Sequence, residues 1–311
     1  MSALRGKYLR LAVFLLTSAS LRAQVSAEIS GRVDDASGSA VGGVTITVKS
    51  VETGATRSVV TDAGGNFRVL SLPVGQQELK AEKPGFKSVV RSGINLAVGQ
   101  EAVVNLQLEV GDLVQQVTVI GEAPLVNTTT SSVSGLVSER EIKDLPLNGR
   151  SFDNLIALNP GAISYSLKSA NTITSLGNTF SVSGRRPLDN IFLLNGVEYT
   201  GSSQLSVTPG GVSGELLGID AVREFNVLAE TYSAEYGKRA GAQVTVVTQS
   251  GTNALHGSLF EFLRNSALDA RNTFDQNFVP PFRRNQFGAA LGGPIKKDRL
   301  FLFGNYEGLQ Q

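Results

Sequence analysis

The chain has 311 residues with 28 basic and 27 acidic side chains, and apolar residues make up 41% of it. This composition is too apolar for a disordered chain, and the charge balance gives no reason to expect nucleic acid as a partner. The lack of cysteine excludes disulfides, zinc fingers and cysteine nucleophiles, and a lone histidine, His256, excludes a metal site with two imidazoles. No paired carboxylates and no nucleophile with a base stand out, so we expect neither an enzyme nor a cofactor or metal site.

The first 23 residues have the organisation of a secretory signal peptide. An apolar run at 11–16 follows a basic region that contains Arg5, Lys7 and Arg10. This run is far shorter than the roughly 20 residues of a membrane-spanning helix. We therefore expect export, with cleavage after Ala23 and with Ala27 as the second candidate. Removal of this leader takes away four basic and no acidic side chains, so the net charge falls from +1 to about −3.

Residues 27–109 read as short strands separated by turn residues, which is the rhythm of a β-sandwich. The expected strands are 29–33, 44–49, 56–61, 67–70, 76–82, 86–91 and 102–108. Val44, Ile46 and Val48 alternate with other residues, so we expect one face of that strand to be buried.

Four segments of this region resemble the carboxypeptidase regulatory-like domain. They are Ile29-Ser30-Gly31-Arg32-Val33, Gly43-Val44-Thr45-Ile46, Thr61-Asp62 through Gly65-Asn66-Phe67-Arg68, and Leu72-Pro73-Val74-Gly75. The resemblance implies a sandwich like those of transthyretin and starch-binding domains. Asp62 and Asn66 are expected to shape a turn rather than to contact calcium or sugar. Carbohydrate binding would be an inference from the fold alone.

Residues 110–132 interrupt the sandwich pattern. They contain a β-prone segment that consists of Gln116, Val117, Thr118, Val119 and Ile120, followed by Pro124 and a run of Thr and Ser. Such a segment suits an extended peptide that adds itself as a strand to a partner's sheet edge. An ordinary edge strand or an unbound linker is the alternative.

Residues 133–251 are expected to form a mixed α/β domain. Ser138 and Glu141 have the spacing of a capping box, which predicts a helix that ends near Leu145. A second helix is expected over 151–158. Further on, a strand closes in the turn Asn195-Gly196, a dipeptide typical of tight hairpins.

The order of elements in this domain resembles the plug domain of TonB-dependent outer-membrane receptors. The matching motifs are Asn195-Gly196-Val197, the segment 219–227, Tyr236-Gly237 and Thr248-Gln249-Ser250-Gly251. The Arg-Gly-Pro that usually follows the second motif is replaced by Val227-Leu228-Ala229-Glu230. Together with the preceding regulatory-like domain, this departure resembles the Oar-like subfamily rather than the siderophore receptors.

The resemblance implies roles for two sets of residues. The segment Gln116–Ile120 matches the position of the TonB box, which pairs with TonB in the periplasm. Arg185 and Arg186 are candidate contacts for an anionic ligand at the apex of the plug, and a solvated or carboxylate-paired loop is the alternative.

Residues 252–311 are expected to begin a transmembrane β-barrel. Strands are predicted at 257–264, 287–291 and 300–306, joined by a long polar connection and then by a tight turn. Outer-membrane barrels have long extracellular loops and short periplasmic turns, so the second turn is expected in the periplasm. The segment 292–303 also resembles the second hairpin of Oar-like receptors. Because a transport barrel needs on the order of 20 strands, we expect a longer receptor that begins with this chain.

The sequence therefore predicts a mainly β protein in five parts. These are a signal peptide (1–23), a regulatory-like sandwich (27–109), a TonB-box segment with linker (110–132), a plug (133–251) and the first barrel strands (252–311). The implied function is energy-coupled, ligand-gated uptake across the outer membrane, with the sandwich in the periplasm. The expected partners are TonB, outer-membrane lipid and an extracellular ligand, with carbohydrate and peptide as candidate classes. The alternative is an exported carbohydrate-binding or adhesive protein without a transport role.

Overall fold

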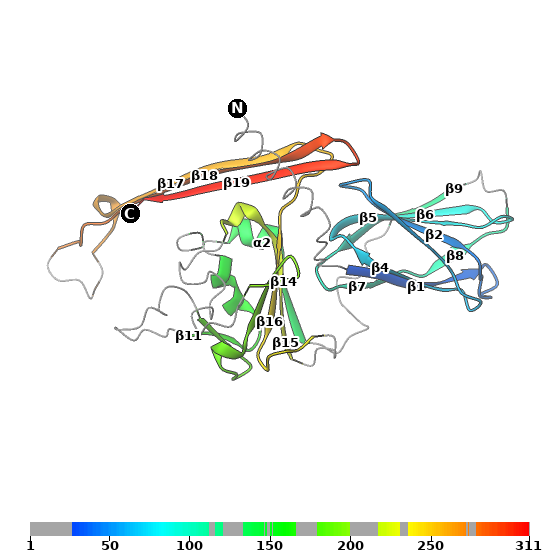
Figure 1. Cartoon of the computed structure of the whole chain (residues 1–311), viewed down its shortest axis with the longest axis horizontal. Coiled ribbons are helices and arrows are strands. Elements are labelled where there is room, and N and C mark those ends of the chain that lie inside the picture. Colours follow the sequence, from blue (N-terminus) through cyan, green and yellow to red (C-terminus); the bar gives the residue numbers. More distant parts are fainter. Residues whose placement is uncertain are drawn as a thin grey trace, which may run out of the picture.

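The computed structural model shows three β-rich regions in chain order (Figure 1). It describes residues 27–111, 116–120, 133–145, 147, 150, 152–165, 179–199, 217–230, 236–271, 273 and 278–310. The expected signal peptide and its cleavage position, Ala23, lie outside the described residues. No helix in these described ranges is long and apolar enough to cross a membrane.

The first region is a sandwich of two sheets. One sheet has the order β4-β1-β7, with β8 also paired to β1, and the other has the order β3-β2-β5-β6-β9. The strands of the first sheet are β1 (Ala27–Asp35), β4 (Asn66–Leu72), β7 (Glu101–Val103) and β8 (Leu106–Leu108). The strands of the second sheet are β2 (Thr45–Ser50), β3 (Thr56–Val60), β5 (Gly75–Glu82), β6 (Ser88–Leu96) and β9 (Gln116–Ile120).

The alternation along β2 buries one face of the strand, as predicted. Ile46 and Val48 are buried in the core between the sheets, whereas Thr45 and Lys49 are exposed. The extended, pleated backbone places successive side chains on opposite faces of a strand, so this pattern fixes which face of the sheet packs inward.

The single strand expected over 102–108 is instead divided into β7 and β8. Both strands run parallel to β1, and between them the amide of Val104 donates to the carbonyl of Ser30. The carbonyl oxygen of Val104 lies 2.0 Å from the position that a Cβ of Gly31 would occupy. This close backbone approach requires glycine at this position of β1.

The turn residues Asp62 and Asn66 have the structural role that was expected. The backbone amide of Asn66 donates to Oδ1 of Asp62 at 2.8 Å, and its side-chain amide also donates to the carboxylate. These bonds to the charged form lower the pKa of Asp62, because they stabilise the carboxylate. Asp62 therefore holds the turn between β3 and β4, which belong to different sheets.

The second region is built on a five-stranded mixed sheet with the order β10-β15-β16-β13-β14. Its strands are β10 (Val133–Val137), β13 (Ile191–Leu194), β14 (Val197–Glu198), β15 (Val222–Glu230) and β16 (Gln243–Thr248). A separate hairpin joins β11 (Ala162–Tyr165) to β12 (Thr179–Val182). Phe180, Phe192 and Phe225 are fully buried in the core of this region, together with the almost fully buried Phe152.

The elements that local sequence signals predict in this region are present in the structure, with one change. Helix α2 (Glu139–Asp144) begins at Ser138 with both reciprocal bonds of a capping box. Asn195 and Gly196 have φ angles of 49° and 83° in the turn between β13 and β14, as a tight hairpin requires. The second expected helix is a 3-10 helix, η2 (Phe152–Leu158), rather than an α-helix.

The third region is a three-stranded antiparallel meander of β17 (His256–Asn265), β18 (Arg283–Lys296) and β19 (Leu300–Gln310). All three strands are longer than the sequence pattern predicts. The meander runs along one side of the second region, which corresponds to the expected plug and is called the plug below, and the turn between β18 and β19 points toward the sandwich (Figure 1). The architecture confirms the expected fold class: a β-sandwich, a mixed α/β region and the strands of an unclosed sheet.

Candidate functional site

The predicted TonB box is an edge strand of the sandwich. β9 pairs in parallel with β6, with Val117 opposite Val89 and Ile120 opposite Ser92. The prediction had placed this segment outside the sandwich, in a linker. In the structure the backbone of β9 continues the sheet beyond β6, and the role of this strand as a TonB box stays a prediction.

The position of β9 leaves one of its edges available. β9 is the last strand of its sheet, and no other described strand pairs with its outer edge. An edge of this kind presents backbone donors and acceptors that another extended strand can pair with. A partner strand therefore has two ways to bind here: addition to the outer edge, or displacement of β9 from β6.

The meander has two faces of different character. The outer face carries large exposed apolar side chains, namely Leu259, Leu263, Leu291, Leu302 and Tyr306. The inner face mixes small and polar residues, including Ser258, Gln286, Gly288, Ala290 and Glu307, with phenylalanines, and it packs toward the plug. Alternating apolar and polar residues along each strand are typical of a sheet with lipid on one side and a filled interior on the other.

Arg150 connects the plug to the inner face of the meander. Its guanidinium lies 3.8 Å from the centre of the Phe260 ring and 5.0 Å from that of Phe262. The same group forms an ion pair with Asp220, which belongs to a short 3-10 turn of the plug, η6 (Ile219–Ala221). Phe260 and Phe262 therefore lie on the inner face of the meander, where both rings contact Arg150 of the plug.

The carboxylates near Arg150 form a hydrogen-bond and ion-pair network that includes residues of two meander strands. Asp220 also accepts a hydrogen bond from Ser258 in β17, and Glu307 in β19 accepts one from Gln286. Glu307 lies 3.9 Å from Nε of Arg150. These side chains are largely buried, so each charge depends on its partners for stabilisation. The network holds the plug against the wall by specific contacts.

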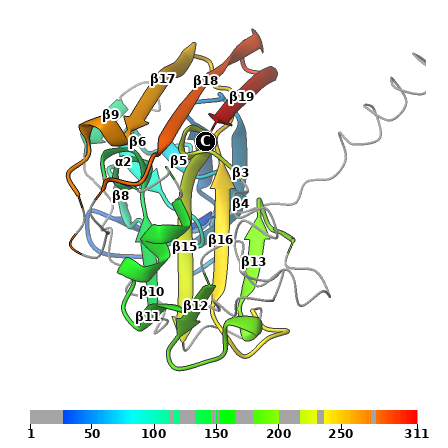
Figure 2. The ribbon, with the colours of Figure 1, turned by 90° about the vertical axis from the view of Figure 1, so that its left-hand side faces the viewer.

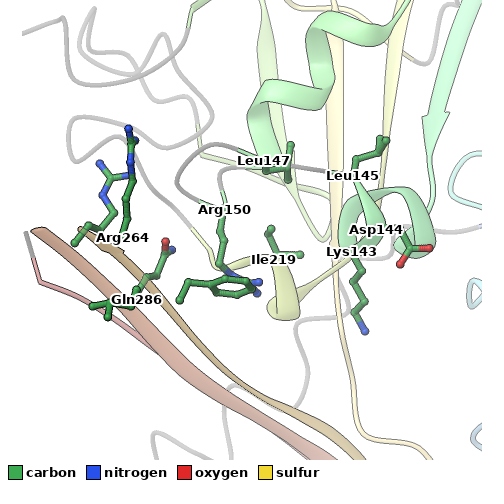
Figure 3. A pocket seen from close by; sticks show the side chains of 11 residues that line it. Lys143, Asp144, Leu145, Leu147, Arg150, Ile219, Arg264 and Gln286 are labelled. Carbon is green, nitrogen blue, oxygen red and sulfur yellow. The ribbon is translucent and has the colours of Figure 1, made fainter. Parts of the chain in front are cut away.

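A pocket of about 440 Å³ lies beside this network (Figure 3). Its lining comes from the end of α2, the segment that leads to Arg150, and strands β17 and β18. The basic side chains in the lining are Lys143, Arg150, Arg264 and Arg284. Lys143, Arg150 and Arg264 form ion pairs with Glu139, Asp220 and Asp269, and the guanidinium of Arg284 lies over the ring of Phe282. The pocket is therefore a polar gap between plug and wall, with its charge largely balanced.

Arg185 and Arg186 lie elsewhere. Both are exposed, in the turn that follows β12, and neither lines the pocket. The β11–β12 hairpin lies at the end of the plug away from β17, β18 and β19 (Figure 2). The expected role of these arginines at a ligand site stays a prediction.

The contacts of His256 indicate a structural role. His256 contacts Thr252 and the carbonyl of Ala254, and its ring stacks on Phe303 at 6.3 Å. Within the described ranges, no group of three or more acidic or histidine side chains is placed to hold a metal ion. The site residues that sequence reasoning missed are Arg150, Asp220 and Glu307. They are single charges far apart in the chain, so no local pattern marks them.

Two family descriptions match parts of the chain. Residues 28–109 match the carboxypeptidase regulatory-like domain, and residues 247–311 match the outer membrane beta barrel domain. A curated relative, the TonB-dependent transporter Oar of Myxococcus xanthus, is 30% identical over 309 residues. This match covers 94% of the chain and 27% of the relative, so the chain spans about a quarter of the length of that protein.

The solved structures that match part of this chain include a siderophore receptor and an outer membrane transporter. The siderophore receptor PirA of Acinetobacter baumannii has a TM-score of 0.42 at 23% identity, over 56% of this chain and 24% of that chain. The outer membrane transporter YddB of Escherichia coli has a TM-score of 0.41 at 14% identity, over 56% of this chain and 26% of that chain. The match to Oar and the two family descriptions confirm that this chain resembles the TonB-dependent outer-membrane receptors of the Oar-like subfamily.

Proposed function

We propose that this chain acts in a TonB-dependent outer-membrane transporter, where it supplies the periplasmic sandwich, the plug and the first strands of the wall. The observation that carries the proposal is the packing of an α/β plug against the inner face of a meander whose outer face carries large exposed apolar side chains. Arg150 joins these parts through Asp220 and Phe260. The similarity to the transporter Oar supports the same function, and neither the match nor the site chemistry suggests an enzyme.

In this proposal, β9 is the strand that engages TonB. It lies between the sandwich and the plug in sequence and has an outer edge to which an extended strand can add. Strand addition gives affinity through backbone hydrogen bonds and tolerates varied side chains. Tension applied to β9 would then reach the plug through the chain that follows it.

The transported ligand binds from outside, and we propose a carbohydrate or a peptide as its class. A pure carbohydrate-binding role for the sandwich is less well supported. Its described residues contain two aromatic side chains, Phe67 and Phe86, and both pack on the core. Phe67 is buried, and the partly buried ring of Phe86 is covered by Lys83, so neither offers an open stacking surface for a sugar.

The first experiment is a pull-down of the full chain, without its leader, with the periplasmic domain of TonB. Val117→Pro removes a backbone donor from the middle of β9 and disfavours strand pairing. Wild-type binding is expected, with a loss of at least tenfold in the variant. Thr129→Pro, outside β9, is the matched control and should bind as wild type does. Absence of wild-type binding, or equal binding by Val117→Pro, would rule out β9 as the TonB-binding strand.

A further inference from the structure

One end of the sandwich meets both the plug and the barrel wall. Three sandwich turns contribute to this junction: the turn between β2 and β3, the turn between β4 and β5, and the turn between β6 and β7. The main partner is β15, a strand inside the plug sheet. The contacts consist of an ion pair, side-chain hydrogen bonds to the backbone of one sandwich turn, and apolar packing.

The ion pair joins Arg223 of β15 to Glu52 of the β2–β3 turn. Two parallel hydrogen bonds of 2.8 Å and 2.7 Å connect the guanidinium to the two carboxylate oxygens. Both side chains are mostly covered, with relative exposures of 16% and 27%. A Cβ at Gly75 would lie 2.2 Å from the guanidinium and 2.6 Å from the carboxylate, so only glycine leaves room for this pair.

The backbone of Val98 is held from both sides by β15. Its amide donates to Oε1 of Glu224 at 2.6 Å, and its carbonyl accepts from the side-chain amide of Asn226 at 3.1 Å. Val98 also packs with Val74 and Val247 in a small buried apolar cluster. Thus β15 recognises a sandwich turn through two polar bonds, while apolar packing excludes water around them.

The same turn of Glu52 reaches the barrel wall. The carbonyl of Glu52 accepts a hydrogen bond of 2.8 Å from the amide of Asn253, which lies between the plug and β17. The side chain of Asn253 in turn bonds the carboxylate of Asp298 at 2.8 Å and its backbone amide at 2.9 Å. Asp298 belongs to the β18–β19 turn, so one sandwich turn is connected to the plug and, through Asn253, to the meander.

We propose that the sandwich has a function of its own in this protein: it is a clamp that fastens the plug to the barrel wall at their periplasmic end. The clamp consists of Glu52, Arg223, Val98, Glu224 and Asn226, with Asn253 and Asp298 on the wall side. Displacement of the plug from the wall then requires opening of these contacts. This function does not depend on which partner binds β9.

A cysteine cross-link tests the clamp in the full chain, which has no cysteine of its own. A Cβ at Gly54 lies 3.3 Å from the Cβ of Asp298, close to the separation of a disulfide. Gly54→Cys with Asp298→Cys should therefore oxidise rapidly in the native protein. The backbone bond from Asp298 to Asn253 is kept in this variant.

The test compares the rate of cross-linking among backgrounds. Arg223→Gln and Asn226→Ala change the plug side, and Glu52→Gln changes the sandwich side. We expect each to slow cross-linking, by roughly tenfold or more for the two variants that break the charged pair. Glu28→Gln, which disrupts a sandwich ion pair with Arg68 outside the junction, is the matched control and should leave the rate unchanged.

Hydrogen exchange separates opening of the clamp from misfolding. In the plug-side variants, the Val98 amide should exchange faster, while amides of β2 and β5 keep their protection. Failure of the cysteine pair to cross-link, or wild-type rates in all three clamp variants, would overturn the proposal. Loss of protection throughout the sandwich in the plug-side variants would also overturn it, because a local clamp predicts a local change.

Discussion

The guanidinium of Arg150 lies 3.8 Å from the centre of the Phe260 ring, so a plug side chain covers an aromatic ring of the first barrel strand. Arg150 pairs with Asp220 on the plug and approaches Glu307 on the third strand. One cation therefore links three parts of the molecule that are distant in sequence. Substitution of Arg150 therefore tests how much this residue contributes to the contact between plug and wall.

Arg150→Ala is expected to destabilise the plug–wall contact by about 3 kcal/mol, because it leaves the buried carboxylate of Asp220 without its cation. Arg150→Lys should lose less, since it keeps the charge but not the planar stacking. The measurement is the urea midpoint, followed by hydrogen exchange in β15 and β17. Arg140→Ala breaks an exposed pair with Asp144 and should change stability by less than about 0.5 kcal/mol. Equal effects of Arg150→Ala and Arg140→Ala would contradict the assigned role.

Glu224 gives the sandwich–plug junction a dependence on pH. Burial raises its pKa to about 7, and nearby Glu139 and Glu52 act in the same direction, whereas the Val98 amide and Arg223 oppose them. With the sandwich undocked, we expect a pKa nearer to the ordinary value of 4.5. The docked form then holds more protons between about pH 4.5 and pH 7, so docking should weaken as pH rises through this window.

Spin labels on the sandwich and plug can measure this effect. Val60→Cys and Leu158→Cys are exposed positions for the two labels. The docked fraction should be larger at pH 5 than at pH 8, and Glu224→Gln should flatten the dependence. A pH profile that persists unchanged in Glu224→Gln would assign the titration to another group.

Substitution of Leu259 tests which face of the meander contacts lipid. This side chain is 86% exposed on the outer face, where the proposed function places lipid. Leu259→Lys should cost up to about 2–4 kcal/mol in the membrane and reduce the share of exported protein recovered in outer-membrane fractions. Asn305→Lys introduces the same charge on the inner face and should have little effect. Loss of recovery for Asn305→Lys alone would reverse the assignment of the two faces.

Gly31→Ala is expected to destabilise the sandwich by at least about 1–3 kcal/mol. The added Cβ would lie 2.0 Å from the carbonyl oxygen and 2.7 Å from the carbonyl carbon of Val104. Both atoms belong to the backbone, so a change of rotamer cannot relieve the overlap. The urea midpoint of the sandwich should fall, whereas Gly237→Ala, which meets no atom within 4 Å, should leave it unchanged. An unaltered midpoint in Gly31→Ala would show that β1 and β7 can separate without cost.

The sequence by itself determined the elements whose signals are local. Alternation along β2 identified its buried face, the capping box of Ser138 and Glu141 placed the start of α2, and Asn195-Gly196 placed a hairpin turn. Each of these signals acts through backbone geometry within a few residues of its own position. The order of such segments was also enough for the family resemblance.

Only the tertiary structure decided which distant groups meet. The segment Gln116–Ile120 was correctly read as β-prone, but its pairing with β6 depends on a sheet edge formed 28 residues earlier. Glu52 and Arg223 form their ion pair across 171 positions, and Arg150 finds Asp220 across 70. A single charge has no periodicity, so its partner is fixed by how the sandwich, plug and meander pack together, and not by the residues beside it in the chain.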